Sequence, residues 1–435
     1  MSEAGNASLR TDARFRSYWA SQGISQFGDR ITELALPLLA ITVLHASTSQ
    51  VGFLTAAVWA PYICALFVGA WVDRQRRKRR VQVYADLARA LVLASLPIAA
   101  WLQFPTLAQL FVVAALAGLG EVFFNTAQPN IFVNLVARDA YVQANSKIST
   151  VRSVSFLAGP AVGGFLIQAL TAPLAILVDA ASFLASAFLI GHIDLTEPPP
   201  QSAHGESLLG GATQGLTFVR RHQFLRASLG CAATLNFFNF IGAALLILFA
   251  SRELGLSATL IGLALGAGAS GGLAAALLAP RIGKRLGVGV TIILGASIAA
   301  AGLAIVPLAS GSTLTKAIVF GAAEFVSGIG IMLFDVNLNA VQTSVTPDEM
   351  RSRASGAFST INYGVRPLGA IVGGLLGTTL GVRQTLFIAA LGMATACIWL
   401  LTSPIRTTRD MKQLDDIDPY TGAPARPSAG MCSPR

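Results

Sequence analysis

The chain has 435 residues, of which 54% are hydrophobic and only 12% are charged, and its formal net charge is +10. Soluble domains carry about 25% charged residues, so this composition excludes an ordinary water-soluble enzyme and predicts an integral membrane protein. The four cysteines lack metal-ligand spacing and the four histidines form no cluster. We therefore expect no metal site and no other cofactor.

Apolar stretches of about 20 residues, the length that crosses a bilayer, recur along the chain. They predict an all-α membrane protein with twelve transmembrane helices, at residues 17–44, 49–72, 81–103, 106–132, 144–169, 173–193, 225–250, 257–280, 288–309, 314–337, 354–380 and 384–403. This order gives an N-terminal six-helix half (1–193), a cytoplasmic linker (194–224) with an amphipathic helix at 207–222, a C-terminal six-helix half (225–403) and a disordered cytoplasmic tail (404–435).

The basic residues predict the orientation of these spans. Of the 31 Lys and Arg residues, 24 fall in the two terminal segments and the loops on the same side, three fall in the opposite loops and four lie inside spans. Basic residues accumulate in cytoplasmic loops. We therefore expect a multi-pass protein of the inner (cell) membrane with both termini in the cytoplasm.

The two halves resemble each other when the chain is shifted by 210 residues. Gly52 then falls on Gly262, and Ser149 falls on Ser359. Three glycines of the fifth span, Gly159, Gly163 and Gly164, fall on Gly369, Gly373 and Gly374. Two halves in the same orientation are one plan of secondary transporters, and pseudo-symmetric six-helix halves are predicted here.

Polar residues recur inside the predicted spans. Asp29 and Glu33 are four residues apart and Gln26 precedes Asp29 by three, so all three project from one helical face. An ionised group at the bilayer centre costs about 2.5–3.5 kcal/mol on insertion scales, which favours a wet or paired site. The further candidates for a substrate cavity and for proton coupling are Glu121, Asn125, Arg152, Asn236, Asn239, Glu324, Asn362 and Arg366.

The alternative for these polar residues is structural, because interhelical hydrogen bonds also hold membrane helices together. Asp29, Glu33 and Glu121 favour function more than the amides do, since three charged acids at similar depth repel one another. Asp179 is expected to be a structural anchor. Asp86 and Arg89, three residues apart, are expected to pair.

Several motifs resemble the major facilitator superfamily. The loop at residues 69–78, GAWVDRQRRK, is similar to its G-x-x-x-D-R-x-G-R-K loop, and Gly159-Pro160-Ala-Val-Gly163-Gly164 is similar to its antiporter element. Residues 15–39 and 177–190 look like a bacterial branch that contains macrolide-efflux and enterobactin-exporter proteins. The fourth span lacks the arginine of the drug–proton antiporters and carries Glu121 nearby instead.

The resemblance implies a cytoplasmic gate made of Gly69, Asp73, Arg74 and Arg77, in which Asp73 docks near the start of the eleventh span. An anion is favoured at a helix amino end by about 0.3–1 kcal/mol. The plain alternative is that these cations only fix topology. The Gly159–Pro160–Gly163–Gly164 element and its equivalents Gly369, Gly373 and Gly374 are expected to pack helices closely.

The sequence therefore predicts a secondary active transporter rather than an enzyme. Its expected partners are a small amphipathic molecule (a drug, macrolide or siderophore-like compound), protons and the lipid bilayer, with no nucleic acid, and the chain is expected to act as a monomer. The surplus of acids in the spans favours cationic or neutral substrates. The alternative is a facilitator or importer of a small nutrient with the same fold and no proton antiport.

Overall fold

Long helices make up nearly the whole chain in the computed structural model, which describes residues 9, 11–195, 197, 208–414, 418 and 420–423. The first part contains α2 (Ala13–Thr42), α3 (Thr48–Trp59), the 3-10 turn η1 (Ala60–Cys64), α4 (Ala65–Asp73), α5 (Lys78–Trp101), α6 (Leu107–Leu135), the turn η2 (Arg138–Ala140), α7 (Tyr141–Leu170) and α8 (Ala172–Gly191). The second part contains α9 (Leu208–Arg221), α10 (Gln223–Leu248), the π turn η3 (Phe249–Glu253), α11 (Ala258–Leu286), α12 (Val288–Ile305), α13 (Thr313–Val345), α14 (Asp348–Thr379) and α15 (Val382–Leu401).

Ten helical segments among the described residues are long and apolar enough to cross a membrane. The two further long helices that coincide with predicted spans, α2 and α14, are more polar. Asp29, Arg30 and Glu33 lie close together in α2, while Asn362 and Arg366 interrupt the apolar part of α14. The polarity of these two helices therefore has to be explained by what they face inside the protein.

Short turns capped by serine or threonine join many of these helices at one end of the molecule. Ser47 forms a capping box with Gln50 at the start of α3, and Ser257 accepts a hydrogen bond from the Leu260 N–H at the start of α11. Such caps satisfy the free amides of a first helical turn. Ser47 and Ser257 are 210 residues apart, so the same local chemistry starts both helices.

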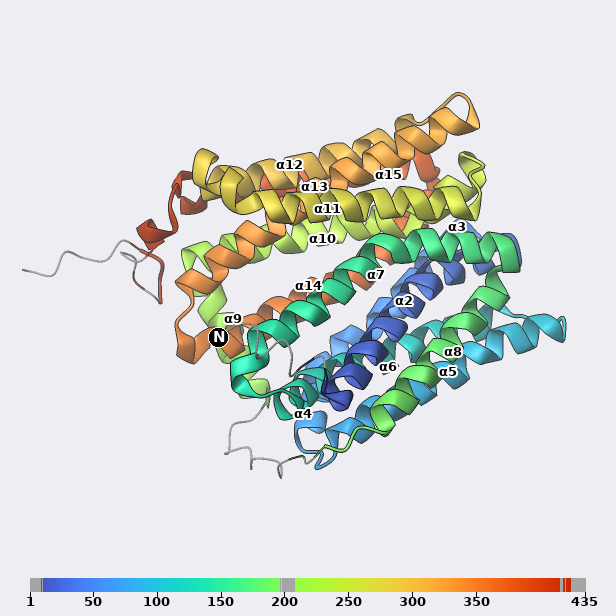
Figure 1. Ribbon diagram of the computed structural model, residues 1–435. Coiled ribbons are helices and arrows are strands. Elements are labelled where there is room, and N and C mark those ends of the chain that lie inside the picture. The colour runs from blue at the N-terminus through green and yellow to red at the C-terminus, as the bar shows by residue number, and fades with distance from the viewer. Residues whose placement is uncertain are drawn as a thin grey trace, which may run out of the picture.

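Figure 1 shows two groups of helices lying side by side, with α2, α5, α6 and α8 in one group and α10, α11, α12, α13 and α15 in the other. Between the groups, α3 packs against α14 and α7 packs against α11. We call these two contacts the α3–α14 seam and the α7–α11 seam. The start of α2, α9 and the α13–α14 turn lie at the same end of the molecule (Figure 1).

The segment after α15 is folded back onto the second group of helices in its described part. The turns η5 (Pro404–Thr407) and η6 (Met411–Leu414) follow α15, and the Gly289 N–H of α12 donates to the Thr408 carbonyl at 3.0 Å. Farther on, the Gln223 N–H donates to the Thr421 carbonyl at 3.0 Å. Composition predicts disorder from residue 404, but Ile405 and Leu414 of this segment are buried. Composition missed this packing because it depends on contacts with distant helices, including backbone hydrogen bonds to free helix amides. Residues 424–435 of the expected disordered tail lie outside the described part of the chain.

His222 lies under this returning tail, where it caps α10 by accepting the Leu225 N–H at 3.4 Å. Burial lowers the pKa of His222 to about 4, although the nearby Asp418 carboxylate opposes the shift. Because the folded form resists protonation, the docked tail is most stable above the ordinary pKa of about 6.5 and loses stability as the pH falls from there towards 4.

We therefore expect a spin label on Ala423→Cys, in a background with the native cysteines replaced by serine, to gain mobility between pH 6.5 and 4. His222→Asn retains an acceptor suited to a helix cap but cannot become charged in this range, so its label mobility should not change with pH. Equal pH dependence in both proteins would contradict the assignment to His222.

Candidate functional site: a polar cavity between the two groups of helices

A cavity of about 1050 Å³ lies between the two groups of helices. Its lining comes from α2, α3, α5, α6, α7, α10, α13 and α14, and it reaches Thr346 and Arg351 at the α13–α14 turn. Sites for drug-sized ligands have volumes of about 300–1,000 Å³. The cavity is therefore large enough for one such molecule.

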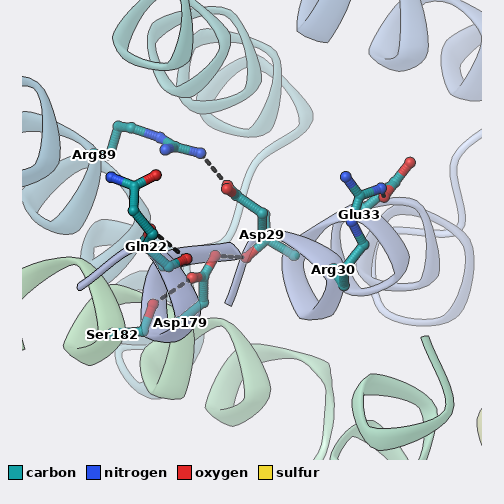
Figure 2. Close-up of polar contacts among 9 residues, drawn as sticks. Gln22, Asp29, Arg30, Glu33, Arg89, Asp179 and Ser182 are labelled. Atoms are coloured by element: carbon teal, nitrogen blue, oxygen red, sulfur yellow. Dashed lines mark hydrogen bonds and ion pairs between the residues drawn. The ribbon is translucent and has the colours of Figure 1, made fainter. Parts of the chain in front are cut away.

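Asp29 on α2 lies on the cavity wall and is held by Arg89 of α5. The Arg89 guanidinium donates to the Asp29 carboxylate (Figure 2). Its carbon atom lies 3.9 Å from the centre of the Phe183 ring of α8. Arg89 is only 5% exposed, so the pair is largely desolvated. The expected pairing of Arg89 with Asp86 is wrong, because α2 and α5 both pack on α8 and this arrangement brings Asp29 within reach of the Arg89 guanidinium. Asp86 still interacts electrostatically with Arg89.

Arg30 and Glu33 form a second pair, one helical turn away from the first. The Arg30 Nη1 atom lies 2.5 Å from the Glu33 Oε2 atom, and the guanidinium also lies over the Phe156 ring of α7 at 5.3 Å. Figure 2 shows this pair pointing away from the Asp29–Arg89 pair. Two of the three acids that the sequence singled out are therefore already compensated by arginines.

Glu121 on α6 is the third of these acids, and it differs from the other two. It lines the cavity and lies near enough to Tyr62, which belongs to the turn η1, for the two side chains to interact. Among the described residues it forms no ion pair within 4.0 Å, although Arg89 and Arg30 are near enough to interact with its charge. Glu121 is thus an acid whose side chain a ligand or a proton can reach without breaking a salt bridge.

The opposite wall belongs to α10, α13 and α14. Asn236, Asn239, Asp335 and Asn362 all line the cavity, and so does Arg366. The amide oxygen of Asn362 is buried without a hydrogen-bond partner among the described residues. Arg366 is surrounded by the rings of Trp59, Phe240 and Tyr363.

Four of the candidates from the sequence lie outside the lining of this cavity. They are Gln26, Asn125, Arg152 and Glu324. Asn125 and Arg152 have exposed side chains. Glu324 shares a face of α13 with Asp335 but lies three turns farther from the α13–α14 turn, where Gly268 of α11 packs against it. Helical spacing identified the faces correctly in several helices but not how far the cavity extends along them.

Asp179 of α8 lies behind the cavity wall, fully buried. It accepts hydrogen bonds from Thr32 of α2 and, at 2.9 Å, from Ser182 (Figure 2). The Thr32 bond ties α8 to α2, which fits the expected role as a structural anchor, whereas Ser182 lies on α8 itself.

The loop between α4 and α5 holds the residues of the expected gate. The Asp73 carboxylate lies 3.8 Å from the Lys78 ammonium and is 72% exposed, and Arg77 precedes the first turn of α5. Gly69 and Arg74 are the neighbouring positions of this loop region. In the described part of the chain, Asp73 makes no hydrogen bond to the start of α14. The cavity reaches this end of the molecule through the α13–α14 turn, so the expected latch is not engaged in this conformation.

Glycines bring the backbones of the two seams together at the other end of the cavity. A Cβ atom on Gly262 of α11 would lie 2.1 Å from the Pro160 carbonyl oxygen of α7, and one on Gly52 of α3 would lie 2.6 Å from the Gly374 Cα atom of α14. Gly164 faces Ala258 in the same way. These contacts leave no room for a side chain.

Other predicted packing glycines fit α7 against α2 and α14 against α10. A Cβ atom on Gly159 would meet the Arg30 side chain at 2.6 Å, and one on Gly163 would lie 3.1 Å from the Ile31 Cα atom. On α14, a Cβ atom on Gly369 would lie 2.3 Å from the Phe237 carbonyl oxygen, and one on Gly373 would lie 2.6 Å from the Ile241 carbonyl oxygen.

A family model for the Major Facilitator Superfamily matches residues 18–370 and 230–425. The chain belongs to this superfamily. Multidrug efflux pump Tap of Mycolicibacterium fortuitum is 28% identical over 84% of the chain and 90% of its own length. The pump of the same name from Mycobacterium tuberculosis (strain ATCC 25618 / H37Rv) is 24% identical over 91% of the chain and 94% of its own length.

Solved structures of the superfamily show the same fold. A bacterial homologue of the iron transporter ferroportin, in an inward-facing state, aligns with a TM-score of 0.72 at 18% identity, covering 89% of this chain and 98% of that one. The nucleoside transporter NupG aligns with a TM-score of 0.68 at 15% identity, covering 90% and 98%. This member of the superfamily is therefore a multi-pass membrane transporter of small molecules.

Proposed function

We propose that this transporter exports small amphipathic molecules in exchange for protons by alternating access. The observation that carries the proposal is the cavity between the two groups of helices, which contains an acid without an ion pair, reaches one end of the molecule and ends below closely packed glycines at the other. The names of the Tap relatives, multidrug efflux pumps, favour export over import.

The proposal takes α2 and α14 as transmembrane helices as well, which gives twelve spans in two pseudo-symmetric halves. Their polar residues face the cavity, so neither helix has to expose them to lipid. The shift of 210 residues places Gly52 on Gly262 and Gly164 on Gly374, which relates the α3–α14 seam to the α7–α11 seam. Two related seams suit a rocking motion around a central site.

The excess of basic residues places the termini and the α13–α14 turn in the cytoplasm. The cavity then faces inward, and substrate enters from the cytoplasm. We place the exchange of substrate for a proton at Glu121, because Asp29 and Glu33 are held by Arg89 and Arg30 whereas Glu121 forms no ion pair among the described residues. Binding at Glu121 releases its proton, the halves rock outward, and protons from outside reload the acid.

Glu121→Gln tests the coupling in proteoliposomes with an imposed pH gradient, using a compound selected by thermal-shift screening of macrolides, siderophores and lipophilic cations. A hydrogen bond to a charged group contributes about 1.5–3 kcal/mol, so removing the charge should lower gradient-driven accumulation by about tenfold or more. Asp348→Asn is the matched control and should transport normally, because the Asp348 side chain is 87% exposed and, unlike its ion-pair partner Arg351, is not part of the cavity lining.

Unchanged gradient-driven accumulation by Glu121→Gln would refute the assignment of coupling to this residue. Counterflow in the wild type that is equally fast with and without a pH gradient would instead support the alternative, a facilitator or importer of a small nutrient.

A further inference from the structure

An arginine enclosed by aromatic rings stands on the cavity wall where the two groups of helices meet. The Arg366 guanidinium carbon lies 4.5 Å from the ring centre of Trp59, 4.4 Å from that of Tyr363 and 5.1 Å from that of Phe240. The rings come from α3, α14 and α10. Stacking on rings stabilises a guanidinium through its flat faces.

The edge of this guanidinium is without a partner. Among the described residues Arg366 forms neither an ion pair nor a hydrogen bond, and its Nε atom is buried without an acceptor. Asp335 interacts with its charge but lies beyond ion-pair distance. Guanidinium N–H groups match the two oxygens of a carboxylate, and this edge-on contact leaves the stacked faces undisturbed.

An acid lines the cavity on the other side of the α3–α14 seam. The Glu121 carboxylate interacts with the nearby Tyr62, whose ring stacks on the Tyr363 ring with centres 5.0 Å apart and planes 22° apart. Tyr363 in turn stacks on Arg366. The lining thus holds a carboxylate and a guanidinium that are connected through two stacked rings.

The other charges of the lining are mostly compensated. Asp29 is paired with Arg89, Glu33 with Arg30, and Arg351 with Asp348. The charged groups left without an ion pair are Glu121, Asp335 and Arg366. The surplus of acids in the spans therefore does not predict the charge of the ligand, because the cavity also contains a positive group, Arg366, that has no ion-pair partner among the described residues.

We propose that the cavity selects amphoteric aromatic molecules, with the ligand carboxylate on Arg366, its ammonium on Glu121 and its ring against the aromatic wall of Trp59 and Tyr363. This inference rests on the proposed function, since it names the substrate class of that transporter. It also places both charged contacts across the seam, so a bound ligand joins α6 of one group to α14 of the other.

Ciprofloxacin is a suitable probe, because it carries a carboxylate and an ammonium at opposite ends of an aromatic body. Its ethyl ester retains only the ammonium and its N-acetyl derivative only the carboxylate. Calorimetric titration of the protein in nanodiscs, without any gradient, should give an affinity about ten- to a hundredfold higher for the parent than for either derivative, as expected for losing one charge-assisted hydrogen bond.

Binding to variants of the protein tests which residue contacts each charged end of the ligand. Arg366→Gln should bind the parent and the ester equally, and Glu121→Gln should bind the parent and the N-acetyl derivative equally. Arg366→Lys keeps the charge and should fall in between, which separates the loss of recognition from misfolding. Arg281→Gln removes an exposed arginine of α11 outside the cavity lining and should behave as the wild type.

Three results would overturn the inference: equal binding of all three compounds, tighter binding of the ester than of the parent, or loss of ammonium discrimination in Asp335→Asn but not in Glu121→Gln. A failure of the proposed function can be distinguished from a failure of this inference. If the parent binds with the expected pattern but no compound from the screen is driven by a pH gradient, export by proton exchange is wrong while the binding site stands.

Discussion

Arg89→Gln is expected to destabilise the protein strongly, because it leaves Asp29 without its partner in a largely desolvated site. Asp86 and Asp179 are fully buried and also interact with the Arg89 charge, so the substitution removes a cation that several acids share. Removing one member of a buried ion pair costs about 3–5 kcal/mol. Thermal unfolding of the purified protein in detergent, followed by thiol-reactive fluorescence, measures the effect.

The control for this experiment is Arg351→Gln. Its ion pair with Asp348 has the same chemistry, but the two side chains are 54% and 87% exposed, and such pairs contribute about 1 kcal/mol or less. The double variant Arg89→Gln/Asp29→Asn should recover part of the stability, because it removes the unpaired charge. A melting temperature for Arg89→Gln equal to that of Arg351→Gln would show that Arg89 does not hold this cluster together.

Gly262→Ala is expected to impair transport by forcing the α7–α11 seam apart. The added methyl group would lie 2.1 Å from the Pro160 carbonyl oxygen, which belongs to a helix backbone and cannot move alone. Overpacking of this kind costs about 1–3 kcal/mol, and the cost falls on the conformation in which the seam is closed. The distribution of conformations should therefore shift towards an open seam.

Two measurements check this expectation. The labelling rate of Thr48→Cys, beside Gly377 in the related α3–α14 seam, should rise in the Gly262→Ala background, while substrate accumulation falls. Gly364→Ala is the matched control, because a Cβ atom there meets nothing within 4 Å although the residue lies on the seam helix α14. If Gly262→Ala and Gly364→Ala showed equal labelling and equal transport, the close contact of Gly262 with Pro160 would not constrain the transport cycle.

The helical architecture could be predicted because it depends on local properties. Length and hydropathy locate most helices, and the three- and four-residue spacing around Asp29 identifies the face of α2 that meets the cavity. The short Ser47 and Ser257 turns also follow from residues next to one another in the chain. Each of these features depends on residues that are close together in the sequence.

The partners of the charged groups could not be predicted in the same way. Arg89 pairs with an acid 60 positions away because α2 and α5 both pack on α8, whereas sequence spacing suggests Asp86. The aromatic enclosure of Arg366 needs Trp59, more than 300 positions earlier in the chain, and exists only where α3 meets α14. The sequence contains one indication of an aromatic site here, because Trp59 and Tyr62 are three residues apart in an apolar helical segment.

The glycine contacts at the seams also determine what is exposed when the two groups separate. Gly52, Gly164, Gly262 and Gly374 have no side chains, so the surfaces that part are largely peptide groups, including the carbonyl oxygens of Pro160 and Ala370. Water hydrates such oxygens readily, whereas it gains little from newly bared leucine or phenylalanine. Little apolar side-chain area therefore has to be exposed to water along this line, which favours separation of the two groups of helices here within an otherwise apolar protein.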